Sequence, residues 1–207
     1  MQKLGKNQKA IVYVHGAGGS AREAERYKSL FPDYEVVGAE YRAFTPWETK
    51  NELCDEIETL SKKYDSLILI ANSIGAYFCM NAKTDKFFER AYFISPVVDM
   101  EKIIADMMIR AGVTERELEE KKVIKTSDGK ELSWEYLRYV RENPVKWNVP
   151  TSILYGSCDN LTSYETIAAF AEKHGASITV MDGGEHWFHT EEQLAFLDKW
   201  LISRTDR

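Results

Sequence analysis

Short apolar runs of strand length alternate along the chain with longer segments of helical pattern, and this alternation limits the fold more than any other feature. The runs are apolar throughout rather than alternately polar, which is typical of strands that are buried on both faces. Strands of this kind, joined by helices, form a parallel sheet between two helical layers. The sequence therefore predicts an α/β fold, a three-layer α/β/α sandwich with a roughly six-stranded, mainly parallel sheet. The predicted strands span residues 10–14, 34–41, 66–71, 91–94, 151–155 and 177–181.

The predicted helices follow these strands in turn. Ser20 and Glu23 form a capping-box signature, and the helix that it opens stops near Pro32. Further helices are predicted over residues 53–64, 74–82 and 163–174, and from Thr190 onward. The loops that leave the carboxyl ends of parallel strands meet at one edge of the sheet, where a site is expected.

One segment interrupts the alternation, between the fourth and fifth predicted strands. It covers residues 99–149, has helical patterns at 100–111 and 134–142, and contains a turn sequence at 126–130 that favours a small hairpin. We interpret it as a cap or lid insertion within one domain spanning residues 1–207. The alternative is an ordinary longer crossover packed on one face.

Charge and composition exclude several classes of function. The 207 residues carry a net charge of −6 without a basic block, so a nucleic-acid-binding role has little support. No apolar run approaches the ~20 residues that span a bilayer, and Met1–Lys9 lacks the apolar core of a signal peptide. Cys54, Cys79 and Cys158 are widely spaced, which indicates neither a disulfide framework nor a cysteine metal site. A cytoplasmic protein is the simplest interpretation.

A serine stands at the end of the third predicted strand, where the apolar run of residues 68–71 stops abruptly. Ser73 has Ala71 two places before it and Gly75 two places after it. Small residues at both positions are typical of a nucleophile elbow, because the two arms of that strand-to-helix turn nearly touch. Ser73 is therefore the candidate nucleophile.

A serine nucleophile needs a base, and His186 is the preferred candidate. It follows the last predicted strand in a glycine-containing loop, before the last helix. His189, three residues further on, is the rival base. His174 lies at a helix end, where it complements the helix dipole. His15 is interpreted as a structural residue that hydrogen-bonds neighbouring loops.

The base needs an orienting acid, for which Asp159 is preferred. It follows the fifth predicted strand after a short turn that contains Gly156. Asp99, which follows the fourth predicted strand, is the alternative acid, although it is equally suited to capping the helix behind it.

Two backbone amides are needed to bind the oxyanion. One would come from Ile74, the residue after the nucleophile, and the other from the glycine-rich loop at 15–19, where Ala17 is the first candidate and Gly18 the second. The loop lacks the Lys-Ser/Thr of a Walker motif, and a GxGxxG motif is absent from the chain.

Together these motifs resemble the α/β-hydrolase superfamily over nearly the whole chain. The resemblance rests on residues 15–16, 71–75, 156–159 and on His186, in the order Ser, Asp, His that the family uses. It implies Ser73 as nucleophile, Asp159 as acid and His186 as base, with a cap in the place of residues 99–149. Ala71 stands where the family prefers glycine, and the chain starts near the family's third strand.

The sequence thus predicts a serine hydrolase that cleaves a small carboxylic ester or related acyl bond through an acyl-enzyme, without a metal or organic cofactor. Its expected partner is a small acyl substrate. Thioester, amide or C–C bond cleavage by the same residues, and a non-catalytic binding protein, are the alternatives. Candidate substrate-pocket residues are His15, Gly16, Gly18, Trp47 and Trp187.

Overall fold

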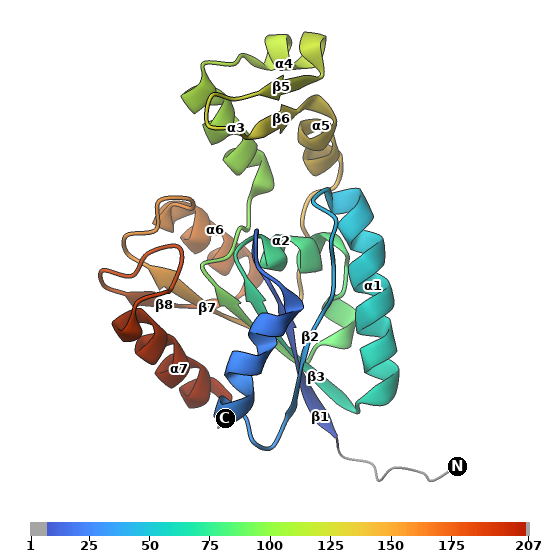
Figure 1. Ribbon diagram of the computed structural model, residues 1–207, viewed down its shortest axis with the longest axis vertical. Helices are drawn as coiled ribbons and strands as arrows, with labels where there is room; N and C mark the ends of the chain where they lie inside the picture. Colours follow the sequence, from blue (N-terminus) through green and yellow to red (C-terminus); the bar gives the residue numbers. More distant parts are fainter. Residues whose placement is uncertain (1–7, 206–207) are drawn as a thin grey trace. The chain divides into compact units, whose positions relative to one another are not determined.

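The computed structural model describes residues 8–205, which fall into two compact units (Figure 1). The first takes in the described residues up to Val98 and from Lys146 onward, and the second is Asp99–Val145. Residues 146–149, which we had placed in the insertion, thus group with the first unit. The idea that the second unit caps a site stays a prediction. The prediction made for the extreme N-terminus falls largely on residues 1–7, outside the described residues.

The first unit is built on a six-stranded, wholly parallel sheet, which confirms the predicted fold class. The strands lie in the order β2-β1-β3-β4-β7-β8. Their bounds are β1 Lys9–Val14, β2 Glu35–Gly38, β3 Ser66–Asn72, β4 Arg90–Ile94, β7 Thr151–Gly156 and β8 Ser177–Met181.

Strand β2 is shorter than predicted, and the difference has a local cause. The chain leaves the sheet at Ala39, whose amide makes the last bond to β1, at the carbonyl of Tyr13. Tyr41 then turns inward, is buried, and donates its hydroxyl to the carbonyl of His15. The predicted strand extended to Tyr41 because this residue has the pattern of a buried position, but it is buried in a loop and not in a strand.

From β1, the next strand in sequence, β2, is added on one side of the sheet, and all its later strands are added on the other side. This change of side at β1 positions the site. Val12 of β1 pairs with Val37 of β2 on one side and with Leu69 of β3 on the other. In doubly wound sheets a crevice opens at such a switch point, outside the carboxyl ends of the strands. The loops after β1 and β3, at residues 15–19 and 73–74, meet there.

Helices cover both faces of the sheet (Figure 1). Helices η1 and α7 lie on one face, and α1, α2 and α6 on the other. Their bounds are η1 Ala21–Leu30, α1 Pro46–Lys63, α2 Ile74–Asn81, α6 Tyr164–His174 and α7 Glu191–Thr205, with a short η2 at Asp85–Phe87. The first helix, η1, is a 3₁₀ helix; at its start the Glu23 amide donates to the carbonyl of Ser20, three residues back.

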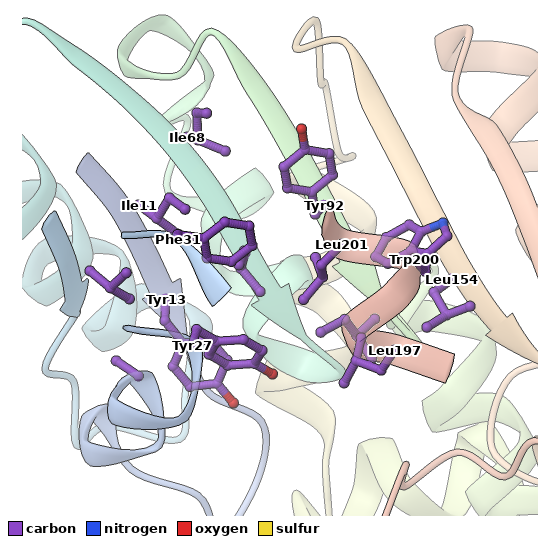
Figure 2. Packing of buried hydrophobic residues seen from close by; sticks show 14 of the residues in the cluster. Ile11, Tyr13, Tyr27, Phe31, Ile68, Tyr92, Leu154, Leu197, Trp200 and Leu201 are labelled. Carbon is purple, nitrogen blue, oxygen red and sulfur yellow. The ribbon is translucent and has the colours of Figure 1, made fainter. Parts of the chain in front are cut away.

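The core beneath η1 and α7 follows from the period-two geometry of the strands. Ile11 and Tyr13 of β1 face this side, while Val12 between them faces the other. Figure 2 shows these side chains packed against Tyr27 of η1 and Leu197 of α7. Burial of large apolar side chains, at roughly 1.5–3 kcal/mol each, fixes η1 and α7 over the sheet.

The second unit contains three helices and a hairpin. They are α3 Met100–Ala111, α4 Glu115–Lys121, β5 Val123–Lys125, β6 Glu131–Ser133 and α5 Trp134–Glu142. Strands β5 and β6 pair antiparallel across the turn at 126–130, as predicted. Arg141 of α5 donates to Glu101 of α3 and to both carboxylate oxygens of Glu115 in α4, so one guanidinium links the three helices.

None of the helices within residues 8–205 is long and apolar enough to cross a membrane.

Candidate active site

Ser73 occupies a strained turn between β3 and α2. Its backbone angles are φ 52° and ψ −122°, and a positive φ at a non-glycine residue costs on the order of 1–3 kcal/mol. The end of β4 holds the turn in place, because the Ser73 amide donates to the carbonyl of Ile94 and the Val97 amide donates to the carbonyl of Ser73, both at 3.0 Å. This is the geometry of a nucleophile elbow.

The small residues around Ser73 are required by contacts with the loop after β1. A Cβ on Gly75 would lie 2.4 Å from the carbonyl oxygen of His15 and 2.8 Å from that of Val14. A Cβ on Gly16 would lie 3.2 Å from Cβ of Ser73. The start of α2 therefore packs directly against the glycine-rich loop, and backbone from both segments reaches the same point.

We expect Gly75→Ala to destabilise the protein by about 1–3 kcal/mol, because the new methyl group meets backbone that has no room to move. Urea unfolding of the variant beside the wild type measures this change. A loss of less than about 0.5 kcal/mol would show that the start of α2 is free to shift.

The loops after β7 and β8 approach each other as closely. A Cβ on Gly156 would lie 2.3 Å from the carbonyl oxygen of Gly184. The Cys158 amide donates to the same carbonyl at 2.8 Å, and the Gly183 amide donates to Oγ of Ser157 at 2.8 Å. These bonds tie the segment that carries Asp159 to the segment that carries His186.

The structure brings the three predicted residues into one hydrogen-bonded chain. Oγ of Ser73 lies 2.8 Å from Nε2 of His186, and Nδ1 of His186 lies 2.8 Å from Oδ2 of Asp159. An ionised carboxylate can only accept, so Nδ1 carries the proton. Nε2 is then the acceptor for the Ser73 hydroxyl, which is the tautomer that a general base needs.

Asp159 is held rigidly. Its side chain is fully buried, and Oδ1 accepts hydrogen bonds from the amides of Leu161 at 2.8 Å and Thr162 at 3.0 Å. One carboxylate oxygen is thus committed to the backbone and the other to His186. This arrangement orients the imidazole and balances a positive charge on it.

The predicted oxyanion donors are the backbone amides of Ala17, in the glycine-rich loop, and of Ile74, directly after Ser73. Within residues 8–205 neither amide donates to another backbone or side-chain group. Both residues line one small cavity, and Ala17 also lines the cleft that contains Ser73. Gly18, the second candidate donor, has φ +75° and lines both spaces.

Residues of the glycine-rich loop line two spaces. The larger, here called the catalytic cleft, has a volume of about 830 Å³ and is lined by Ser73 and His186 together with residues of η1 and α7. The smaller, here called the loop cavity, has a volume of about 310 Å³ and is lined by residues 15–20 and 40–44 with Ile74 and Phe78.

The alternative acid and base, Asp99 and His189, make other hydrogen bonds. Asp99 is exposed and caps α3, since its Oδ1 accepts from the Lys102 amide at 2.9 Å, while the His186 imidazole is paired with Asp159. Nδ1 of His189 donates to the carbonyl of Trp187 at 2.7 Å, and its ring stacks on the Trp187 indole.

Of the predicted substrate-pocket residues, some line the catalytic cleft or the loop cavity and one lines neither. His15 is buried, stacks on Tyr41 with ring centroids 4.1 Å apart, and lines the loop cavity. Gly16 lines both spaces, and Trp187 lines the catalytic cleft with 70% of its surface exposed. Trp47, a predicted pocket residue, lies in the first turn of α1 and lines neither the catalytic cleft nor the loop cavity.

Sequence reasoning missed the wall of the catalytic cleft that η1 provides. Glu23, Arg26 and Tyr27 line the cleft, yet the sequence presents Glu23 only as a capping-box residue. The sequence carries part of this information, because Arg26 and Tyr27 follow Glu23 by three and four residues, and residues at that spacing share one face of a helix. No group of three or more His, Cys, Asp or Glu side chains within residues 8–205 is placed to hold a metal ion.

Comparison with solved structures identifies the architecture. Est1E from Butyrivibrio proteoclasticus matches with a TM-score of 0.71 and 17% identity, over 98% of this chain and 90% of that one. The chain has the α/β-hydrolase fold. A putative hydrolase from Agrobacterium vitis matches with a TM-score of 0.74 and 14% identity, over 95% of this chain and 87% of that one.

Alpha/beta hydrolase domain-containing protein 10 from mouse has the same fold, with a TM-score of 0.73 and 14% identity over 98% of this chain and 92% of that one. No family model matches the sequence, and no curated protein matches it. Identities of 14–17% show the α/β-hydrolase fold and leave the chemistry to the site itself.

Proposed function

We propose that the protein is a serine hydrolase that cleaves a small carboxylic ester through an acyl-enzyme on Ser73. One observation carries the proposal: the continuous hydrogen-bonded chain from Ser73 through His186 to Asp159, with both links at 2.8 Å. Three separate loops contribute these groups, each at the carboxyl end of a parallel strand. A hydrogen-bonded series of nucleophile, base and orienting acid is the arrangement that activates a serine.

The proposed reaction has two stages. Oγ of Ser73 attacks the ester carbonyl carbon while its proton passes to Nε2 of His186, and the amides of Ala17 and Ile74 bind the oxyanion. The tetrahedral intermediate then collapses, and the imidazolium gives its proton to the leaving alkoxide, which departs as the alcohol. Water then attacks the acyl-enzyme carbonyl while its proton passes to His186. The second tetrahedral intermediate collapses, the imidazolium returns that proton to Oγ of Ser73, and the carboxylic acid is released.

Ester cleavage is favoured over the other reactions by the solved neighbours. They include Est1E with ferulic acid bound and an esterase from Thermogutta terrifontis with butyrate bound. Another neighbour is E-2-(acetamidomethylene)succinate hydrolase. Thioester, amide and C–C bond cleavage by the same residues are the alternative reactions. A non-catalytic binding protein would have no need for the complete hydrogen-bonded series at Ser73.

A fluorophosphonate probe tests the nucleophile directly, since it phosphonylates an activated serine. We expect stoichiometric labelling of the wild type, with the adduct on the peptide that contains Ser73, and no labelling of Ser73→Ala. Ser95→Ala is the matched control, because Ser95 is fully buried beside the elbow. Equal labelling of wild type and Ser73→Ala would contradict the assignment.

A further inference from the structure

The catalytic cleft has a polar wall, formed by Tyr13, Glu23, Arg26 and Tyr27. We propose that this wall binds a hydroxyl group on the alcohol part of the ester, so that the preferred substrates are esters of polyhydroxylated alcohols rather than of simple alkyl alcohols. The proposal rests on the proposed function and adds a substrate class to it.

Glu23 supplies a fixed acceptor in this wall. Oε1 accepts from the Ser20 amide at 3.0 Å, and Oε2 accepts from the hydroxyl of Tyr13 at 2.5 Å. Burial, and then the neighbouring Tyr27 and Glu23, raise the pKa of the Tyr13 phenol, so Tyr13 stays protonated and donates. Each carboxylate oxygen has a second lone pair, which leaves Glu23 able to accept from a substrate hydroxyl.

Tyr27 supplies an unused hydroxyl beside it. The residue is only 4% exposed and lines the cleft, yet its hydroxyl has no hydrogen-bond partner within residues 8–205. Burial raises the pKa of Tyr27, so the phenol is neutral and can both donate and accept. Figure 2 shows its ring next to that of Tyr13. The centroids of the two rings are 5.2 Å apart. Unlike the fully buried unpaired hydroxyls of the fold, that of Tyr27 is open to the cleft, where a ligand hydroxyl can reach it.

The charges in the wall select a neutral group over an anion. Nη2 of Arg26 pairs with Asp198 of α7 and also donates to the carbonyl of Leu194. The charges of Arg26 and Asp198 therefore cancel, and Glu23 leaves the wall with one net negative charge. A carboxylate on the substrate would be repelled, whereas a hydroxyl would find donors and acceptors.

The position of His186 assigns this wall to the alcohol part of the substrate. Nε2 must protonate the departing oxygen, so the alcohol lies on the His186 side of Ser73. His186 lines the catalytic cleft together with the polar wall. The loop cavity, lined by Ile74, Phe44 and Phe78 and not by His186, is left for the acyl part.

The test compares butyrate esters that differ only in the alcohol: 2,3-dihydroxypropyl, n-propyl and 2-carboxyethyl. The measurement is kcat/KM, which reports acylation, with each ester expressed as a ratio to n-propyl. We expect the wild type to favour the dihydroxypropyl ester by at least about threefold, and Tyr27→Phe to lower that ratio by about 3- to 10-fold. Tyr34→Phe is the matched control, because Tyr34 packs against the same core but lies outside the cleft lining, and its ratio should equal that of the wild type.

Glu23→Gln gives a second readout, which a purely structural role would not produce. Removing the negative charge should raise the ratio for the 2-carboxyethyl ester by about threefold or more. Unchanged ratios in both Tyr27→Phe and Glu23→Gln would overturn the proposal. If the fluorophosphonate probe failed to label Ser73 and no ester were cleaved, the proposed function would fail and this inference with it; labelling with unchanged ratios would refute the inference alone.

Discussion

His186→Ala is expected to lower kcat for ester hydrolysis by about 10⁵- to 10⁶-fold, since loss of the base alone removes most of the contribution of a triad. The physical reason is that Nε2 of His186, 2.8 Å from Oγ of Ser73, is the acceptor in reach of the hydroxyl proton. The measurement is the steady-state rate with n-propyl butyrate, corrected for the uncatalysed reaction. Fluorophosphonate labelling should slow in parallel.

His189→Ala is the comparison for that experiment, because His189 was the rival base. Its imidazole contacts Trp187 and lies 3.4 Å from Glu185. We expect its kcat to fall by no more than about tenfold. If His189→Ala lost as much activity as His186→Ala, with unchanged thermal unfolding of both, the base would have to be reassigned.

Asp159→Asn is expected to lower kcat by about 10⁴-fold, because an amide beside Nδ1 favours the wrong tautomer of His186. The change is nearly isosteric, and the amide oxygen can still accept from the amides of Leu161 and Thr162. The folded structure should therefore persist, which thermal unfolding checks. KM should change much less than kcat, since Asp159 is buried behind the imidazole.

Asp99→Asn is the matched control for the acid. Asp99 accepts from the Lys102 amide at the start of α3, and asparagine caps a helix as well as aspartate does. We expect wild-type kcat and unfolding for this variant. Loss of activity in Asp99→Asn with retention in Asp159→Asn would mean that the orienting acid lies in the second unit.

The sequence predicted the parallel sheet and the grouping of Ser73, Asp159 and His186 because both follow from local patterns. Strand-length apolar runs determine the sheet, and small residues mark the turns where backbones touch. Gly75, against the carbonyl of His15, and Gly156, against the carbonyl of Gly184, are such contacts. Each positions a loop at the same edge of the sheet. His186 is preferred over His189 because it lies in the glycine-containing loop before the last helix, whereas His189 is closer to the start of that helix.

The polar wall could not be predicted, because it depends on packing between distant segments. Tyr13 lies in the middle of an apolar strand, where its hydroxyl gives no sign of a partner. Only the packing of η1 over β1 brings Glu23 within hydrogen-bond distance of it. Arg26 in turn meets Asp198, which is 172 residues away in the sequence. Periodicity along a single segment carries no information about such pairs.

The chain connectivity of the triad has a consequence for the order in which activity can arise during synthesis. Ser73 and the proposed oxyanion donors, Ala17 and Ile74, belong to the first part of the chain, but His186, the proposed base, lies 113 residues after Ser73. The two stretches meet in the sheet through the pairing of β4 with β7. Under the proposed function, Ser73 stays inactive until the segment that carries His186 has been made and has folded against it, and recovery of esterase activity during refolding requires the pairing of β4 with β7.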